Sequence, residues 1–340
     1  MDTKIKRNLK FGKVLAPLVI KSRFRSFPLW AHLFVTRKCN LSCPYCFIKD
    51  NSKDELDLAN MELVVDRLHN LGVRIISFYG GEPTIRKDFP ELVKYTCSKG
   101  MITHVSTNGT KLDKQYIDRL AGAGIDIINL SVDSVLDTSR KDMAHSKRVL
   151  EDLLIARDHF GFVMAVNMVL TSQNVGSALE TIRTLGNYDI PVSICPIVKN
   201  TYNSVPQDQS LFFNTPKERA ALYGVLRHIE VLRKSGIKII DPPQYFRDVK
   251  SFMEGVLKDW DCTAGEYSIS VDVDGRIQFC CGLQPENISI FDLVRGDLNG
   301  MYKARRDAAV ARCKKVCIGN CHYDASYLIR HPMSVIKTVG

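Results

Sequence analysis

The chain has 340 residues, of which 45% are hydrophobic, 25% are charged and 11 are cysteine. This composition excludes a disordered or collagen-like chain and is typical of a folded protein with a sizeable core. The net charge is +10, but the basic excess lies in residues 1–30 and 295–340, so the body between them is close to neutral.

Both ends of the chain mix basic and apolar side chains. Residues 4–25 combine lysines and arginines with apolar residues at roughly helical spacing, and residues 327–337 have a similar mix. Such segments favour either a helix that covers the open side of the fold or a peripheral contact with an anionic membrane or an acidic partner. The apolar residues of the first segment are Leu9, Phe11, Val14, Leu15 and Leu18.

The compartment follows from what the sequence lacks. No apolar run approaches the ~20 residues that span a bilayer, and no basic stripe interleaved with aromatic residues indicates nucleic-acid binding. We expect a cytoplasmic protein, with a membrane-peripheral location as the alternative. Its cysteines then stay reduced and are available for metal binding or chemistry.

The first predicted strand, over residues 30–36, runs directly into a loop with three cysteines. Cys39, Cys43 and Cys46 lie within eight residues, on a loop that contains proline and can turn three sulfurs toward one centre. Structural zinc sites are closed by four ligands, and no fourth Cys or His is near. An open three-thiolate site remains, and soft thiolates select iron–sulfur clusters as well as zinc.

The spacing Cys-x3-Cys-x2-Cys resembles the signature of the radical S-adenosylmethionine (SAM) superfamily. The resemblance implies a [4Fe-4S] cluster whose fourth iron chelates the amino and carboxylate groups of SAM. One electron from the reduced cluster would then cleave SAM to a 5′-deoxyadenosyl radical, which removes a hydrogen atom from the substrate. A chance pattern or a zinc knuckle is the alternative for the motif taken alone.

Beyond this loop, helical and strand patterns alternate, which predicts repeated βα units around a parallel sheet. Together with the first strand they make six units, a count that resembles the partial (β/α)6 TIM-like barrel of radical SAM enzymes. Helices are predicted near 57–71, 89–98, 113–123, 146–159 and 174–186, and strands at 73–79, 102–107, 126–132, 162–170 and 191–198.

Small polar residues and glycines gather where the predicted strands end. The Gly-Gly-Glu-Pro run after the second strand resembles the family motif that receives the SAM amino group, and Arg140, or Arg148 in its place, would pair with the SAM carboxylate. Ordinary structural roles are the alternative at each position: a strand-to-helix turn, a solvated helix charge, a buried amide. The predicted SAM contacts are Tyr79, Gly80, Gly81, Glu82, Ser106, Thr107, Asn108, Ser131, Arg140 and Asn167.

Six more cysteines lie in the last 79 residues, too many for core packing. The stretch from Glu266 to Phe279 alternates around an Asp-Gly turn, which predicts a hairpin that brings Cys262 and Cys280 together. The remaining cysteines of this group are Cys281, Cys313, Cys317 and Cys321.

This region resembles the auxiliary-cluster domain of radical SAM enzymes called SPASM or, in its one-cluster form, twitch. The resemblance implies one auxiliary [4Fe-4S] cluster, bound by Cys262, Cys280, Cys317 and Cys321, with Cys313 as the alternate ligand. A structural zinc site is the competing interpretation. Cys281 is left over, either as an inert thiol or as a hydrogen-atom donor or substrate ligand.

The sequence therefore predicts an α/β radical SAM enzyme with a small C-terminal iron–sulfur domain. The predicted units are a basic segment over 1–29, the barrel over 30–240, the auxiliary domain over 241–325 and a basic tail over 326–340. The expected reaction is oxidation, epimerisation or cross-linking of a peptide, sugar or lipid-linked substrate, with flavodoxin or ferredoxin as electron donor. Decarboxylation or methyl transfer is the alternative reaction, and a zinc protein that binds a partner is the alternative class.

Overall fold

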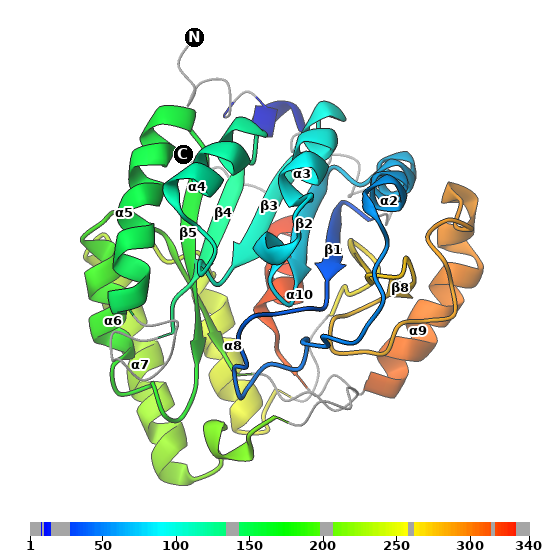
Figure 1. Cartoon of the computed structure of the whole chain (residues 1–340). Coiled ribbons are helices and arrows are strands. Elements are labelled where there is room, and N and C mark those ends of the chain that lie inside the picture. Colours follow the sequence, from blue (N-terminus) through cyan, green and yellow to red (C-terminus); the bar gives the residue numbers. More distant parts are fainter. Residues whose placement is uncertain are drawn as a thin grey trace.

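The computed structural model describes residues 8, 10–14, 28–133, 143–197, 207–257, 262–313 and 317–330. Its centre is one open sheet of eight strands in the order β6-β5-β4-β3-β2-β1-β7-β8 (Figure 1). All neighbours pair in parallel except β7 and β8, which form an antiparallel hairpin. The strands are β1 Trp30–Thr36, β2 Ile75–Gly80, β3 Ile102–Thr107, β4 Ile127–Ser131, β5 Val163–Leu170, β6 Val192–Pro196, β7 Ser268–Val271 and β8 Ile277–Gln278.

Helices follow the strands in the predicted alternation, and the α/β class and partial barrel are confirmed. The pattern did not predict the last four helices, and Figure 1 shows one of them, α10, on the opposite side of the sheet from α3 and α4. The helices are α2 Leu58–Leu71, α3 Phe89–Ser98, α4 Lys114–Gly122, α5 Met143–Phe160, α6 Ala178–Gly186, α7 Pro216–Lys234, α8 Pro243–Met253, α9 Met301–Cys313 and α10 Asn320–Arg330. Short 3-10 turns are η1 Pro83–Ile85, η2 Gln209–Leu211 and η3 Arg295–Asn299.

The predicted C-terminal hairpin is present and continues the barrel sheet. Ser270 lies opposite Gln278 across the hairpin, and Ser270 is also the register partner of His32 on β1. The parallel pairing of β7 with β1 places the cysteine-rich C-terminal region directly beside the strand that leads into the first cysteine loop. The division into a barrel and a separate auxiliary domain stays a prediction, and the sheet runs across its boundary.

Strand alternation separates an apolar outer face from an inner face that carries polar and aromatic rings. On β1, Leu33 and Val35 join the buried apolar core. His32 faces the other way: its ring lies 5.3 Å from that of Tyr79 on β2 and 5.7 Å from that of His322 on α10. This inner face is the barrel lumen, and α10 covers it.

The lumen histidines His32 and His104 are buried. Ser77 Oγ accepts a hydrogen bond from Trp30 Nε1 at 2.7 Å and lies 2.7 Å from His104 Nδ1. Burial lowers the pKa of His104 to about 4, and burial also lowers the pKa of His32 to about 3. His32 Nε2 and Ser270 Oγ find no hydrogen-bond partner among the described residues. Both histidines are therefore neutral polar groups of the lumen at neutral pH.

The basic N-terminal segment packs on the body where the structure describes it. Residues 10–14 are helical, Phe11 is buried, and Lys10 Nζ lies 2.6 Å from Asp126 Oδ2, just before β4. This supports the covering helix over these residues, at the amino-terminal edge of the sheet. Leu9, Leu15, Leu18 and residues 331–337 lie outside the described residues.

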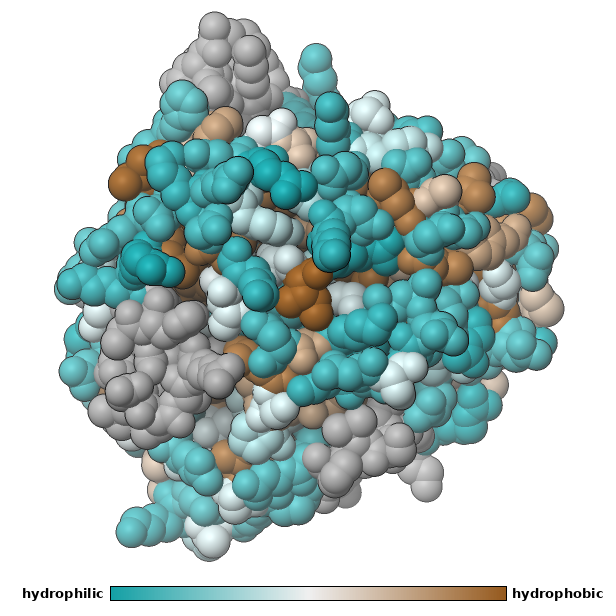
Figure 2. All heavy atoms as spheres, viewed as in Figure 1, coloured by the Kyte–Doolittle hydropathy of each residue, from teal (hydrophilic) through white to brown (hydrophobic). Residues whose placement is uncertain are grey.

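Figure 2 shows a face that is mostly hydrophilic, with apolar side chains scattered over it. Within the described ranges, every helix is too short or too polar to span a membrane.

We predict that His104→Asn makes stability less sensitive to acid. In the wild type the unfolded imidazole takes up a proton below about pH 6.5, whereas the buried imidazole does so only near pH 4. Folding stability is therefore lost as the pH falls through this window, by up to roughly 3 kcal/mol for one such group. Asn keeps a polar partner for Ser77 without this titration. Denaturant unfolding of the metal-free chain at pH 7 and pH 4.5 measures the difference.

A matched control is His159→Asn, at an exposed position near the end of α5. It should retain the acid sensitivity of the wild type. Equal acid sensitivity of His104→Asn and the wild type would contradict the assignment.

Candidate functional site

The first cysteine loop, residues 37–50, begins at the carboxyl end of β1, and its last residue lies beside its first. The N–H of Asp50 donates to the carbonyl of Arg37 at 2.9 Å, which closes the loop, and the N–H of Cys46 donates to the carbonyl of Cys43 at 3.0 Å. Cys39, Cys43 and Cys46 are all half-buried. In parallel α/β folds this edge of the sheet carries the active site.

Backbone N–H groups point at the sulfurs of this loop. The N–H of Leu41 lies 3.4 Å from Cys39 Sγ, and the N–H of Ile48 lies 3.5 Å from Cys46 Sγ. Both bonds come from the residue two positions after the cysteine, and the bond from Leu41 lowers the pKa of the Cys39 thiol. Hydrogen bonds to sulfur of this kind tune iron–sulfur clusters, so the donor set fits such a group.

The same local pattern, a backbone N–H from the residue two positions after the cysteine, recurs in the second cysteine region. Cys280 Sγ accepts from the N–H of Gly282 at 3.4 Å, and Cys317 is hydrogen bonded by Gly319. Cys97 donates to the carbonyl of Gly124 at 3.0 Å; Cys195 donates to the carbonyl of Pro196 at 3.4 Å and receives its backbone hydrogen bond from the distant Asn320. These two thiols are thus bound as protonated packing groups.

In the first cysteine loop, burial and neighbouring acidic groups raise the pKa of the Cys39 thiol. Burial raises the pKa of Cys39, the N–H of Leu41 opposes this, and Glu82, Cys46 and Cys43 each raise it further. The three thiols are neighbours rather than a closed set, because no three His, Cys, Asp or Glu side chains of the described residues lie at metal-ligand spacing. Ionising all three together needs a positive group among them.

The paired glycines after β2 are required by the backbone of this loop. The N–H of Gly81 donates to the carbonyl of Thr36 at 2.8 Å, and the N–H of Glu82 donates to that of Lys38 at 2.9 Å. A Cβ on Gly80 would lie 2.1 Å from the Thr36 oxygen, and one on Gly81 would lie 2.1 Å from the Lys38 oxygen. The motif was predicted from a ligand contact, and the structure adds a packing reason for it.

Glu82 is buried and serves the scaffold. Its Oε1 accepts from the N–H of Thr84 at 3.1 Å, from Thr84 Oγ1 at 2.6 Å and from Thr107 Oγ1 at 2.7 Å. Its Oε2 accepts from the N–H of Asn108 at 2.7 Å. The side chains of Glu82 and Thr107, both predicted SAM contacts, are therefore bonded to each other and join the ends of β2 and β3.

Two further residues anchor the loop to the barrel. Asn108 Nδ2 donates to Asn40 Oδ1 at 3.1 Å and lies 3.9 Å from Cys39 Sγ. On the other side, the hydroxyl of Tyr45 is hydrogen bonded to the buried carboxylate of Asp133 after β4. The loop is thus held from β3 and β4 as well as from β1.

The remaining predicted SAM contacts divide into two groups. Ser131 and Asn167 are register partners on β4 and β5, half-buried on the lumen face, and Ser106 is half-buried near the end of β3. Arg140 lies outside the described residues, and its alternate Arg148 is exposed on α5. Among the described residues, the structure thus gathers the serines, amides and glycines along one edge of the sheet.

In the second cysteine region, four thiols influence one another. Burial raises the pKa of Cys317 to about 12, and Cys262, Cys313 and Cys281 add to the shift. Cys280, the predicted ligand, is next to Cys281 in the chain. Cys321 begins α10, and its side chain lies outside the described residues.

One connection between the two regions was missed at the sequence level. Arg37 Nε lies 2.8 Å from Asp272 Oδ1, although the two residues are 235 positions apart. No periodic pattern or motif links them. The only signal is that Asp272 starts the Asp-x-Asp-Gly turn of the predicted hairpin.

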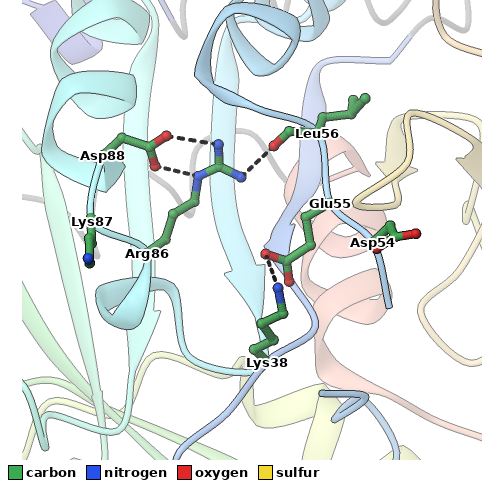
Figure 3. A pocket seen from close by; sticks show the side chains of 7 residues that line it. All are labelled: Lys38, Asp54, Glu55, Leu56, Arg86, Lys87 and Asp88. Atoms are coloured by element: carbon green, nitrogen blue, oxygen red, sulfur yellow. Dashed lines mark hydrogen bonds and ion pairs between the residues drawn. The ribbon is translucent and has the colours of Figure 1, made fainter. Parts of the chain in front are cut away.

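A shallow pocket of about 590 Å³ lies outside this edge (Figure 3). Arg86 Nε donates to Asp88 Oδ1 at 2.6 Å, and Arg86 Nη1 donates to the carbonyl of Leu56 at 2.9 Å. Lys38 Nζ lies 3.6 Å from Glu55 Oε2. Four of the charged groups of the pocket thus form two pairs, Arg86 with Asp88 and Lys38 with Glu55. The lining residues are Lys38, Asp54, Glu55, Leu56, Arg86, Lys87 and Asp88, none of which is a predicted SAM contact.

Comparison with known proteins decides the family. The model of the radical SAM superfamily matches residues 33–197. This stretch is a radical SAM domain. The superfamily uses a [4Fe-4S] cluster and SAM, so the resemblance seen in the cysteine spacing is confirmed.

Individual relatives match parts of the chain. Fe-coproporphyrin III synthase of Methanosarcina barkeri is 37% identical over 136 residues, which are 39% of this chain and 31% of that protein. PqqA peptide cyclase of Granulibacter bethesdensis is 34% identical over 168 residues, 45% of this chain and 43% of that protein. The chain thus spans less than half the length of these radical SAM relatives.

The fold similarity extends further along the chain. Streptococcus suis SuiB, in a crystal structure with the precursor peptide SuiA, has a TM-score of 0.63 and 18% identity, and the match covers 88% of this chain and 71% of that one. At this identity the likeness shows the fold alone. It includes the region beyond the radical SAM domain.

We predict that Gly81→Ala disrupts the first cysteine loop. The added Cβ would lie 2.1 Å from the Lys38 oxygen, and backbone cannot give way as a flexible side chain can. A displacement of about 1 Å at a reacting centre can reduce rates about 100-fold, so SAM cleavage should fall by that order and bound iron should decrease. Iron analysis and the rate of 5′-deoxyadenosine formation measure this.

The control is Gly122→Ala at the end of α4, where a Cβ would meet nothing within 4 Å. It should keep wild-type iron and activity. If Gly81→Ala behaved in the same way, the close backbone contact would not govern the loop.

Proposed function

We propose that the chain is a radical SAM enzyme that removes a hydrogen atom from a peptide substrate, assisted by an auxiliary [4Fe-4S] cluster. The observation that carries the proposal is the set of backbone N–H groups directed at Cys39, Cys46, Cys280 and Cys317. The first two sulfurs lie on a loop at the carboxyl edge of a radical SAM domain. When bound, the first cluster supplies the electron that cleaves SAM.

The chain's own residues divide this work. Cys39, Cys43 and Cys46 hold the first cluster in the proposal, and Gly80, Gly81 and Glu82 hold the loop in place. The proposed SAM contacts remain Tyr79, Gly80, Gly81, Glu82, Ser106, Thr107, Asn108, Ser131, Arg140 and Asn167. Thr107 and Glu82 act through their mutual hydrogen bond, which fixes the backbone of the edge that SAM would meet.

The auxiliary ligands are proposed from the second cysteine region. Cys262 and Cys317 influence each other, and Cys280 and Cys317 both accept a backbone hydrogen bond. Cys262, Cys280, Cys317 and Cys321 remain the proposed set, with Cys313 as the alternate because it also acts on Cys317. The cluster would receive or return an electron, or bind substrate.

A peptide is the favoured substrate class. PqqA peptide cyclase is among the relatives, and SuiB, whose fold is similar, was solved with its precursor peptide SuiA. Oxidation, epimerisation and cross-linking are the net reactions in scope, and a donor such as flavodoxin or ferredoxin would supply the electrons. Another relative, Fe-coproporphyrin III synthase, is named for a product that is not a peptide.

Iron analysis and SAM cleavage test the proposal together. After anaerobic reconstitution we expect about eight iron atoms per chain, four for each cluster, and 5′-deoxyadenosine on addition of dithionite and SAM. The Cys39→Ala, Cys43→Ala, Cys46→Ala triple variant should keep about four iron atoms and lose cleavage. Stoichiometric zinc with no cleavage would show a zinc protein instead, and loss of all iron from the triple variant would remove the auxiliary cluster from the proposal.

A further inference from the structure

The side chain of Arg37 crosses from the first cysteine region to the second. Arg37 is only 6% exposed, and its guanidinium lies 4.4 Å from the centre of the Phe34 ring. Its Nε donates to Asp272 Oδ1 at 2.8 Å and its Nη2 to Gln278 Oε1 at 3.4 Å. Both acceptors belong to the β7–β8 hairpin region, so one side chain joins two distant parts of the sequence.

The backbone of Arg37 is fixed in the first loop. Its N–H donates to Glu55 Oε1 at 2.9 Å, and its carbonyl accepts the N–H of Asp50 at 2.9 Å, which closes the loop. Cys39 follows two residues later. Any movement of the Arg37 side chain relative to its backbone is limited by burial and by the stacking on Phe34.

Gln278 carries the connection to the second loop. It is 1% exposed, and its Nε2 donates to the carbonyl of Cys281 at 3.3 Å and to that of Leu283. These carbonyls lie in the turn that follows Cys280. The amide thus accepts from Arg37 with its oxygen and holds the cysteine turn with its nitrogen.

The charges along this connection are balanced inside the protein. The Asp272 carboxylate is fully buried and is bound by both Arg37 and Lys53. Burial alone would raise the pKa of Asp272, but the two cations hold it below its usual range. A buried, charge-assisted contact with defined hydrogen-bond geometry resists displacement more than an exposed ion pair does.

We propose that Arg37 is a positioning residue that fixes the turn after Cys280 against the first cysteine loop, through Asp272 and Gln278. Its role toward two metal centres rests on the proposed function, because only then do both loops carry clusters. The connection itself belongs to the protein and can be tested without metal. Arg suits this role because its planar guanidinium donates in two directions at once, which Lys does not.

Hydrogen exchange of the full metal-free chain tests the connection. Arg37→Met should speed amide exchange in residues 38–50 and 279–284 by about tenfold or more, because the contacts that oppose local opening are lost. Gln278→Leu is the milder variant: it keeps the Arg37–Asp272 pair, so only residues 279–284 should exchange faster. Unchanged exchange of residues 279–284 in both variants would overturn the proposal.

The matched control and the rescue separate positioning from general damage. Arg276→Met removes an ion pair with Asp274 at the tip of the same hairpin, where Arg276 is well exposed, and should leave both loops unchanged. Asp272→Asn leaves the buried guanidinium without a counter-charge and should loosen both loops. Adding Arg37→Gln to it restores a neutral pair, so the double variant should exchange more slowly than Asp272→Asn alone.

A spectroscopic measurement then examines the reconstituted protein. In the wild type, two reduced clusters at one fixed separation should give a defined magnetic coupling by electron paramagnetic resonance. Gln278→Leu should broaden or remove that coupling while total iron stays constant, and an unchanged coupling would count against the positioning role. If the wild type itself binds only about four iron atoms, the proposed function fails on its auxiliary cluster, and the exchange data still decide whether Arg37 positions the second loop.

Discussion

Where β1 and β2 end, two backbones touch without space for a side chain, and the candidate site depends on this contact. The N–H groups of Gly81 and Glu82 bind the carbonyls of Thr36 and Lys38, so the bonding pattern of the parallel sheet continues into the loops. Cys39 comes next in the chain. The position of the first sulfur is therefore set by sheet geometry, which is more precise than the geometry of a free surface loop.

The charge distribution of this edge follows from the same arrangement. Two of the nearby cations are engaged elsewhere, since Arg37 pairs with Asp272 and Lys38 lies beside Glu55. Lys49 stays in the loop, where its Nζ lies 2.8 Å from Ser42 Oγ. Glu82 and the thiols of Cys43 and Cys46 lie close to the Cys39 thiol, and each of the three raises the pKa of Cys39. Once ionised, these thiols would be complementary to a cationic group, and both an iron–sulfur core and a sulfonium carry positive charge.

The sequence predicted the features that depend on short, contiguous stretches of the chain. The bounds of β3 and α3 agree with the prediction because each has a clear period and flanking turn residues. The last four helices, α7 to α10, were missed, although α7 begins with a capping box and α8 has a clear amphipathic pattern. The three cysteines and the Gly-Gly-Glu-Pro run are contiguous and were recognisable, whereas the bond between Glu82 and Thr107 and the pair of Arg37 with Asp272 join residues 25 and 235 positions apart. Such partners are brought together only by the topology of the sheet.

The two adjacent cysteines after β8, Cys280 and Cys281, have different surroundings. Cys280 accepts a hydrogen bond from its own turn, through the N–H of Gly282. Cys281 instead acts electrostatically on His32, His322 and Cys317. Since His32 and His322 face each other in the lumen and Cys317 belongs to the second cysteine region, Cys281 lies where these two regions meet. Geometry agrees with this: His322 follows Cys321 on α10, faces His32 in the lumen and lies 3.1 Å through Nδ1 from Ser268 Oγ on β7, so the lumen borders the second cysteine region.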